Sequence, residues 1–252
     1  MALPHDEAGS GPAVVLLHAG IADRTMWSEH LGWLADAGYR AVAVDLPGFG
    51  DAPEPPGELA PWADVLQTMD ELFIDTAALV GVSLGGNVAL RVAVSAPERV
   101  SALVLVGARP PGQEPSAELM AVWDAEEGAV ERGDIDAAVE AVVDGWTLPD
   151  APPALRERVA AMQRRAYAWQ VGAAEPTQAP DPLEQDPAAL ARLDVPTLVA
   201  VGDRDKRDFA EGAELLVKTL PRARKAVIAG AGHLAPLETP AAFRELLEGF
   251  LP

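Results

Sequence analysis

Cysteine is absent from this 252-residue sequence. The protein therefore forms no disulfide bond, offers no thiolate to a metal ion and has no cysteine nucleophile. Long hydrophobic runs are also missing, because no apolar stretch approaches the roughly 18 residues needed to cross a bilayer. The first residues, Met-Ala-Leu-Pro-His-Asp-Glu, lack the basic start and the apolar core of a signal peptide. We predict a cytoplasmic protein with no membrane-spanning segment.

Basic residues are scarce. The chain has 19 lysines and arginines against 39 aspartates and glutamates, which gives a formal charge of −20. Such a surface repels phosphate backbones and anionic lipids, so neither nucleic acid nor a membrane is an expected partner. Only 4 histidines occur, with no His-x-x-x-His spacing and no carboxylate cluster beside one of them. The sequence therefore indicates no metal site and no cofactor.

Apolar residues make up 49% of the chain, which is enough to bury a large core. Short aliphatic runs bounded by Gly, Pro or Asp are typical of buried parallel strands, and they occur at residues 14–18, 41–45, 78–82, 102–106, 197–201 and 226–228. Helical patterns occur at residues 26–37, 62–72, 87–96, 210–220 and 240–251. This alternation predicts an α/β protein with a doubly wound, mostly parallel sheet.

The alternation stops between residues 110 and 194, a stretch rich in Ala, Glu and Arg. Helical periodicity returns at residues 117–131, 135–146 and 154–171, and proline-rich connectors lie before and after the last of these segments. We predict a core domain formed by residues 1–109 and 195–252, and a helical lid inserted at residues 110–194.

A serine flanked by glycines follows the predicted strand 78–82. The residues Gly-Val-Ser-Leu-Gly at 81–85 match the G-x-S-x-G nucleophile elbow, a sharp turn from a strand into a helix. Small neighbours are needed because the backbone reverses tightly, and Ser83 is expected at positive φ. The turn would present the Ser83 hydroxyl as a nucleophile.

A serine nucleophile needs a base, and the base needs an acid that orients it. His233 is the candidate base, because among the four histidines it alone follows the last predicted strand, in a glycine-rich loop. Gly-Asp-Arg-Asp at 202–205 follows the preceding strand. Either aspartate could be the acid, or Asp203 could shape the turn. Because parallel strands end at one edge of a sheet, an aspartate there can meet Ser83 and His233.

Four motifs in this order resemble those of the α/β-hydrolase superfamily, along nearly the whole chain. They are Leu-Leu-His-Ala-Gly at 16–20, Asp-Leu-Pro-Gly-Phe-Gly at 45–50, the elbow, and the pair Gly-Asp-x-Asp and Gly-x-Gly-His at 202–205 and 230–233. The resemblance implies that Asp205 is the acid of a Ser-His-Asp triad. Few residues precede the first strand, so the usual N-terminal hairpin should be shortened, leaving six or seven strands.

The resemblance also implies an oxyanion hole. Its backbone N–H donors would belong to Gly20, with Ile21 as the alternative, and to Leu84, the residue after the nucleophile. His18 is expected to order this loop rather than to act as a second base.

The resemblance extends to small lidded serine esterases and enol-lactonases. Haloalkane dehalogenases and most epoxide hydrolases share the fold but carry a carboxylate at the elbow, so Ser83 argues against both. The predicted function is hydrolysis of a small-molecule carboxylic ester, lactone or thioester: Ser83 attacks the carbonyl, His233 transfers the proton and Asp205 holds the imidazole.

The substrate pocket is expected to include Ile21 and the lid residues Trp123, Trp146 and Trp169. Arg164 and Arg165 receive no role, because adjacent arginines on a helix usually face solvent. Other functions remain open: a carbon–carbon bond hydrolase, a cofactor-free haloperoxidase-like enzyme with the same triad, or a non-catalytic ligand receptor on the same scaffold.

Overall fold

The computed structural model describes residues 1–55, 57–173 and 176–252. Its central sheet has seven strands in the order β1-β3-β2-β5-β6-β8-β9. β1 is antiparallel to β3, and the other neighbours in this sheet are parallel, which confirms the predicted sheet. The strands are β1 (His5–Ala8), β2 (Ala13–Leu17), β3 (Arg40–Val44), β5 (Ala77–Val82), β6 (Val100–Val106), β8 (Thr197–Gly202) and β9 (Ala223–Ile228).

The N-terminal strand β1 is what remains of the expected hairpin. It pairs with β3 from His5 opposite Val44 to Ala8 opposite Ala41. Its sequence, His-Asp-Glu-Ala, has no apolar run because it forms an edge of the sheet and stays partly exposed. By contrast, every residue of β5 and β8 is buried, which explains their continuous apolar sequences.

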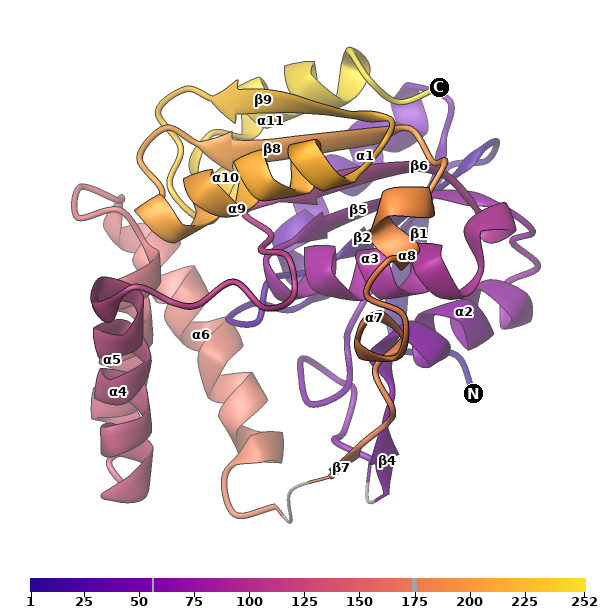
Figure 1. The fold of residues 1–252 in the computed structure, drawn as a ribbon. Helices are drawn as coiled ribbons and strands as arrows, with labels where there is room; N and C mark the ends of the chain where they lie inside the picture. The colour runs from indigo at the N-terminus through magenta and orange to yellow at the C-terminus, as the bar shows by residue number, and fades with distance from the viewer. Residues whose placement is uncertain (56, 174–175) are drawn as a thin grey trace.

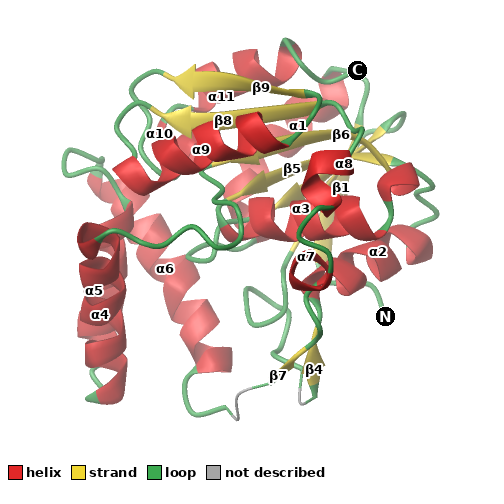
Figure 2. Cartoon of the chain, in the orientation of Figure 1, coloured by secondary structure: helices red, strands yellow, loops and turns green. Residues whose placement is uncertain are grey.

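Helices cover both faces of the sheet (Figures 1 and 2). In the view of Figure 1, α2 (Pro61–Glu71), α3 (Leu84–Ser95) and α9 (Arg207–Thr219) lie in front, and α1 (Ser28–Asp36) and α11 (Pro240–Glu248) lie behind. Short helical turns, η1 (Arg24–Trp27), η2 (Pro97–Arg99) and α10 (Ala235–Glu238), complete the core. These helices pack on the sheet through an apolar face. In α11, for example, Phe243 and Leu247 are buried and the charged face is exposed.

Three further helices, α4 (Ala117–Glu131), α5 (Ile135–Trp146) and α6 (Pro153–Gln170), coincide with the predicted helical segments to within one residue. We call them the helical insertion. They lie beyond the carboxyl ends of the strands, to which the arrowheads of β8 and β9 point in Figure 1. Two begin at side-chain caps: Ser116 accepts the N–H of Leu119 at 3.2 Å, and Asp134 accepts that of Ala137 at 3.1 Å.

The chain returns to the core before the predicted end of the insertion at residue 194. β7 (Thr177–Gln178) pairs with β4 (Glu58–Leu59), and α7 (Pro182–Gln185) and α8 (Ala189–Arg192) come next. Arg91 of α3 forms an ion pair of 2.5 Å with Asp181, at the start of α7. Residues 174 and 175 of the predicted insertion lie outside the described residues.

None of the helices in the described part of the chain is long and apolar enough to span a membrane.

Candidate active site

Ser83 occupies the turn between β5 and α3 with φ 52° and ψ −112°, which confirms its predicted positive φ. The turn is possible because the residues two positions before and after Ser83 are glycines without a side chain. A Cβ on Gly81 would overlap the carbonyl oxygen of Gly85, and a Cβ on Gly85 would overlap that of Leu17. The Ser83 N–H donates to the carbonyl of Val106 in β6 at 2.8 Å, which ties the turn to the sheet.

His233 and Asp205 meet at the carboxyl edge of the sheet. Nδ1 of His233 lies 3.0 Å from Oδ2 and 3.2 Å from Oδ1 of Asp205. Both side chains are almost fully buried, with 3% and 2% of their surface exposed. An imidazole donates to a carboxylate through Nδ1–H, which leaves the lone pair of Nε2 available to take a proton.

Asp203 makes a different contact. Its Oδ1 accepts the N–H of Gly230 at 2.8 Å, in the loop that leads to His233. Asp205 is therefore the aspartate that contacts the imidazole, and Asp203 shapes the turn, the second of the two roles that the sequence left open.

Ser83 and His233 open into one cavity of about 230 Å³. Within the described residues, no hydrogen bond of 3.5 Å or less joins their side chains; such bonds are often long in the free enzyme and tighten when substrate binds. The cavity is lined by Ala19, Gly20, Ile21, Ser83, Asn87, Gly107, Arg109, Trp123, Glu126, Trp146, Phe209 and His233.

Two aromatic rings enclose the imidazole of His233. The ring centroid of Phe209 lies 4.1 Å away and that of Trp146 4.7 Å away. On another side lies Gly107, where an added Cβ would be 3.1 Å from the imidazole. These contacts limit the rotation of the imidazole and exclude water from it. The contact with Trp146 comes from the helical insertion.

The expected oxyanion residues are neighbours. A Cβ on Gly20 would lie 3.5 Å from Cβ of Leu84, and Gly20 lines the cavity. Leu84 is the first residue of α3, so its N–H belongs to the first turn, where helical carbonyl partners are lacking. Leu84 does not line this cavity; it lines a separate surface pocket, while its side chain packs beside Gly20.

His18 is buried beneath this loop. Its Nε2 accepts the N–H of Leu46 at 2.9 Å, so Nδ1 carries the proton and donates to the carbonyl of Ala19 at 2.8 Å. Burial lowers the pKa of His18, which favours the neutral ring. His18 does not line the cavity and instead fixes the backbone beside Gly20, as expected.

Three of the four expected pocket residues, Ile21, Trp123 and Trp146, line the cavity. The prediction for Trp169 is wrong. Its indole N–H donates to the carbonyl of Gly50 at 2.9 Å, in the loop after β3, and 40% of the residue is exposed. Trp169 ends up there because it lies in the last turn of α6, where the helix meets this loop.

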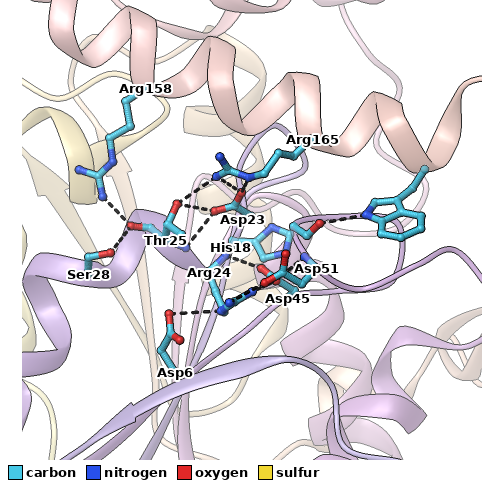
Figure 3. A network of polar contacts seen from close by, with 12 residues as sticks. Asp6, His18, Asp23, Arg24, Thr25, Ser28, Asp45, Asp51, Arg158 and Arg165 are labelled. Carbon is cyan, nitrogen blue, oxygen red and sulfur yellow. Dashed lines mark hydrogen bonds and ion pairs between the residues drawn. The ribbon is translucent and has the colours of Figure 1, made fainter.

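The side of α6 that meets the core carries a network of polar contacts (Figure 3). Nε of Arg165 donates to the buried carboxylate of Asp23 at 2.8 Å, and Arg158 donates to the carbonyl of Thr25 at 2.5 Å. Arg165 therefore does not simply face solvent, contrary to expectation. Beneath it, Arg24 pairs with the buried Asp45. Asp23 follows the loop of Gly20 and Ile21 by two residues, so the network connects α6 to that loop.

Sequence reasoning missed several lining residues, among them Phe209, Arg109, Asn87 and Glu126. Arg109 follows the carboxyl end of β6, so the rule that located Asp205 could have found it. Asn87 lies one helical turn after the elbow. Glu126 lies three residues after Trp123 on α4, and its carboxylate accepts the hydroxyl of Tyr167 at 2.6 Å. Burial raises the pKa of Glu126.

The described residues contain no group of three or more His, Asp or Glu side chains placed to hold a metal ion. They do contain a doubly wound sheet, a serine on a strand-to-helix turn and a buried histidine–aspartate pair at the carboxyl edge. This combination defines a class of α/β proteins built around a nucleophile elbow.

The family can be stated from comparison with known proteins. The family model described as alpha/beta hydrolase fold matches residues 12–240. The chain belongs to the α/β-hydrolase fold family.

Similar proteins within the family have different activities. The 2-hydroxy-6-oxo-6-phenylhexa-2,4-dienoate hydrolase of Comamonas testosteroni is 38% identical over 110 residues, which cover 41% of this chain and only 38% of that protein. The 2-hydroxy-6-oxo-6-(2'-aminophenyl)hexa-2,4-dienoic acid hydrolase of Metapseudomonas resinovorans is 29% identical over 97% of this chain and 86% of its own length. The structure of a thermophilic esterase from Thermogutta terrifontis superposes with a TM-score of 0.76 and 28% identity, over 98% of this chain and 93% of that chain.

Proposed function

We propose that this protein is a serine hydrolase that cleaves small-molecule carboxylic esters, lactones or thioesters through an acyl-enzyme intermediate. The observation that carries the proposal is the buried pair of His233 and Asp205, whose imidazole opens into the same cavity as the hydroxyl of Ser83. A histidine oriented by a carboxylate beside a serine at positive φ is the arrangement that activates a hydroxyl.

The chemistry derives from these positions. Oγ of Ser83 attacks the substrate carbonyl while its proton passes to Nε2 of His233. The tetrahedral intermediate collapses, and the imidazolium gives the proton to the leaving oxygen or sulfur. Water then attacks the acyl-enzyme, His233 takes its proton, and the same proton returns to Ser83 as the acid is released. Asp205 keeps the imidazole in the required tautomer throughout.

The negative oxygen of the intermediate requires donors. Gly20 lies beside Leu84, the residue after Ser83, so their backbone N–H groups are the candidate donors, and loss of one such donor typically costs about 3 kcal/mol of barrier. The likeness to the Thermogutta terrifontis esterase supports acyl transfer as the reaction.

The test is hydrolysis of short-chain p-nitrophenyl esters. Wild-type protein should release p-nitrophenol, Ser83→Ala should lose the activity, and the exposed control Ser95→Ala should retain it. Covalent labelling by a fluorophosphonate should follow the same order. Turnover by Ser83→Ala at the wild-type rate would refute the proposal, and a complete lack of labelling in the wild type would favour a ligand receptor.

Carbon–carbon bond hydrolysis is the second candidate, because the two dienoate hydrolases are similar to this chain and one of them is similar along most of it. The same triad could act on a vinylogous diketone. A panel of esters against such diketones separates the candidates: a clear preference in kcat/KM for the diketones would replace the esterase assignment.

A further inference from the structure

A second carboxyl group lies beside the buried pair. Glu238 ends α10, five residues after His233, and its Oε2 accepts the N–H of Gly232 at 2.7 Å. That N–H belongs to the residue directly before His233. The bond therefore fixes the Ala231–Gly232 peptide, which lies one residue before the imidazole.

The loop before His233 is held at three points. Asp203 accepts the N–H of Gly230, the N–H of Arg204 donates to the carbonyl of Ala231 at 2.9 Å, and Glu238 accepts the N–H of Gly232. The first carboxylate lies in an exposed contact, whereas the contact of Glu238 is partly buried. Of the three contacts, the one made by Glu238 is next to His233 and is partly shielded from water.

Gly232 is packed closely on both sides. A Cβ there would lie 2.8 Å from Cδ2 of Leu148 and 3.0 Å from Oε1 of Glu238. Leu148 follows Trp146 by two residues, in the segment that leaves α5. Glu238 therefore lies where the histidine loop meets the segment that follows α5 of the helical insertion.

The charges around Glu238 are those of the site itself. His233 and Asp205 face it, and so does Arg204, which pairs with Asp150 at 2.8 Å. Burial raises the pKa of Glu238, and Asp205 acts in the same direction, while the N–H groups of Gly232 and Leu148 and then His233 oppose the rise.

We propose that Glu238 is a positioning residue for His233: its carboxylate accepts the Gly232 N–H and so holds the loop that carries the imidazole in place. The proposal rests on the proposed function of His233 as a base. It is testable by substitution, because a glutamine can still accept the Gly232 N–H, whereas an apolar side chain cannot.

The experiment compares Glu238→Gln, Glu238→Met and the exposed control Glu245→Gln with the wild type. The first readout is amide hydrogen exchange of Gly232, which does not depend on activity. The second is the pH profile of kcat/KM for a p-nitrophenyl ester. Met is chosen because it nearly conserves volume, and Glu238→Ala serves if the methionine variant does not fold.

We expect faster exchange of the Gly232 N–H in Glu238→Met, by at least tenfold, and near wild-type exchange in Glu238→Gln. The plateau of kcat should fall by at least tenfold in the methionine variant, with KM changed little. In the glutamine variant kcat and KM should stay near the wild-type values, because the amide oxygen can still accept the Gly232 N–H.

Unchanged Gly232 exchange in Glu238→Met would overturn the positioning role, and so would a loss of kcat in Glu238→Gln as large as that in Glu238→Met. If wild-type protein hydrolyses no ester, the proposed function fails by itself. The positioning role is then decided by exchange alone.

Discussion

The indole of Trp146 lies with its ring centroid 4.7 Å from that of the His233 imidazole. The two residues come from different parts of the fold, since Trp146 ends α5 of the helical insertion and His233 follows the last strand of the core. The insertion thus forms part of the wall that shields the candidate base from water.

Two substitutions of Trp146 should distinguish the contribution of its ring packing to stability from that of its indole N–H group. Trp146→Ala should destabilise the fold by about 3 kcal/mol, as is typical for a buried aromatic ring, and should lower kcat/KM because the imidazole is left loose. Trp146→Phe should cost much less, because the indole N–H is buried without a hydrogen-bond partner among the described residues. Urea denaturation and ester kinetics measure both. Equal losses in the two variants would contradict this account.

Ser83→Gly should be more stable than the wild type although inactive. Ser83 is held at φ 52°, a region that glycine enters without a steric penalty. The gain should be about 1 kcal/mol, since relief of strain outweighs the greater freedom of the unfolded glycine. Thermal unfolding measures it, and the control Ser95→Gly, at the last residue of α3 and outside the turn, should give no such gain. A lower melting temperature for Ser83→Gly would show that the turn is not strained.

Stability should fall as the pH drops below about 6.5, the ordinary pKa of histidine. Burial lowers the pKa of both His18 and His30 in the folded protein. The unfolded chain then binds more protons, so the stability from these neutral rings is full above pH 6.5 and declines below it, by at most about 1.4 kcal/mol per pH unit for each histidine. Urea unfolding between pH 8 and pH 5 measures the slope. His30→Gln should flatten it, and an identical slope would count against the assignment.

The contact between Asp23 and Arg165 should stabilise the attachment of α6. Burial alone would raise the pKa of Asp23, but hydrogen bonds from Thr25 and Arg165 outweigh it and the net pKa is lowered. Asp23→Asn should cost about 1–2 kcal/mol at pH 7. A lowered carboxyl pKa contributes stability above about pH 4 that disappears as the pH falls further, so the two proteins should converge in acid. A difference that does not depend on pH would indicate that only packing is lost.

Much of this protein could be predicted from its sequence, because the signals are local. Buried strands such as β5 and β8 are apolar throughout, and the helices α4 and α5 begin after Ser116 and Asp134, whose side chains cap them. The elbow is equally local, since Gly81 and Gly85 are required by the turn itself. The edge strand β1 was missed because its exposed residues carry no apolar pattern.

Other features were decided only by the tertiary structure, since they depend on contacts between residues far apart in the chain. The sequence offered Asp203 and Asp205 equally by position, and only the path of the loop after β9 brings one of them to His233. The sequence alone gives the same reason to place Trp169 and Trp146 in the pocket. The direction of α6 nevertheless places Trp169 against Gly50, away from the cavity. The sequence determines the type of each side chain, whereas the direction in which that side chain points depends on how the helices and the sheet pack together.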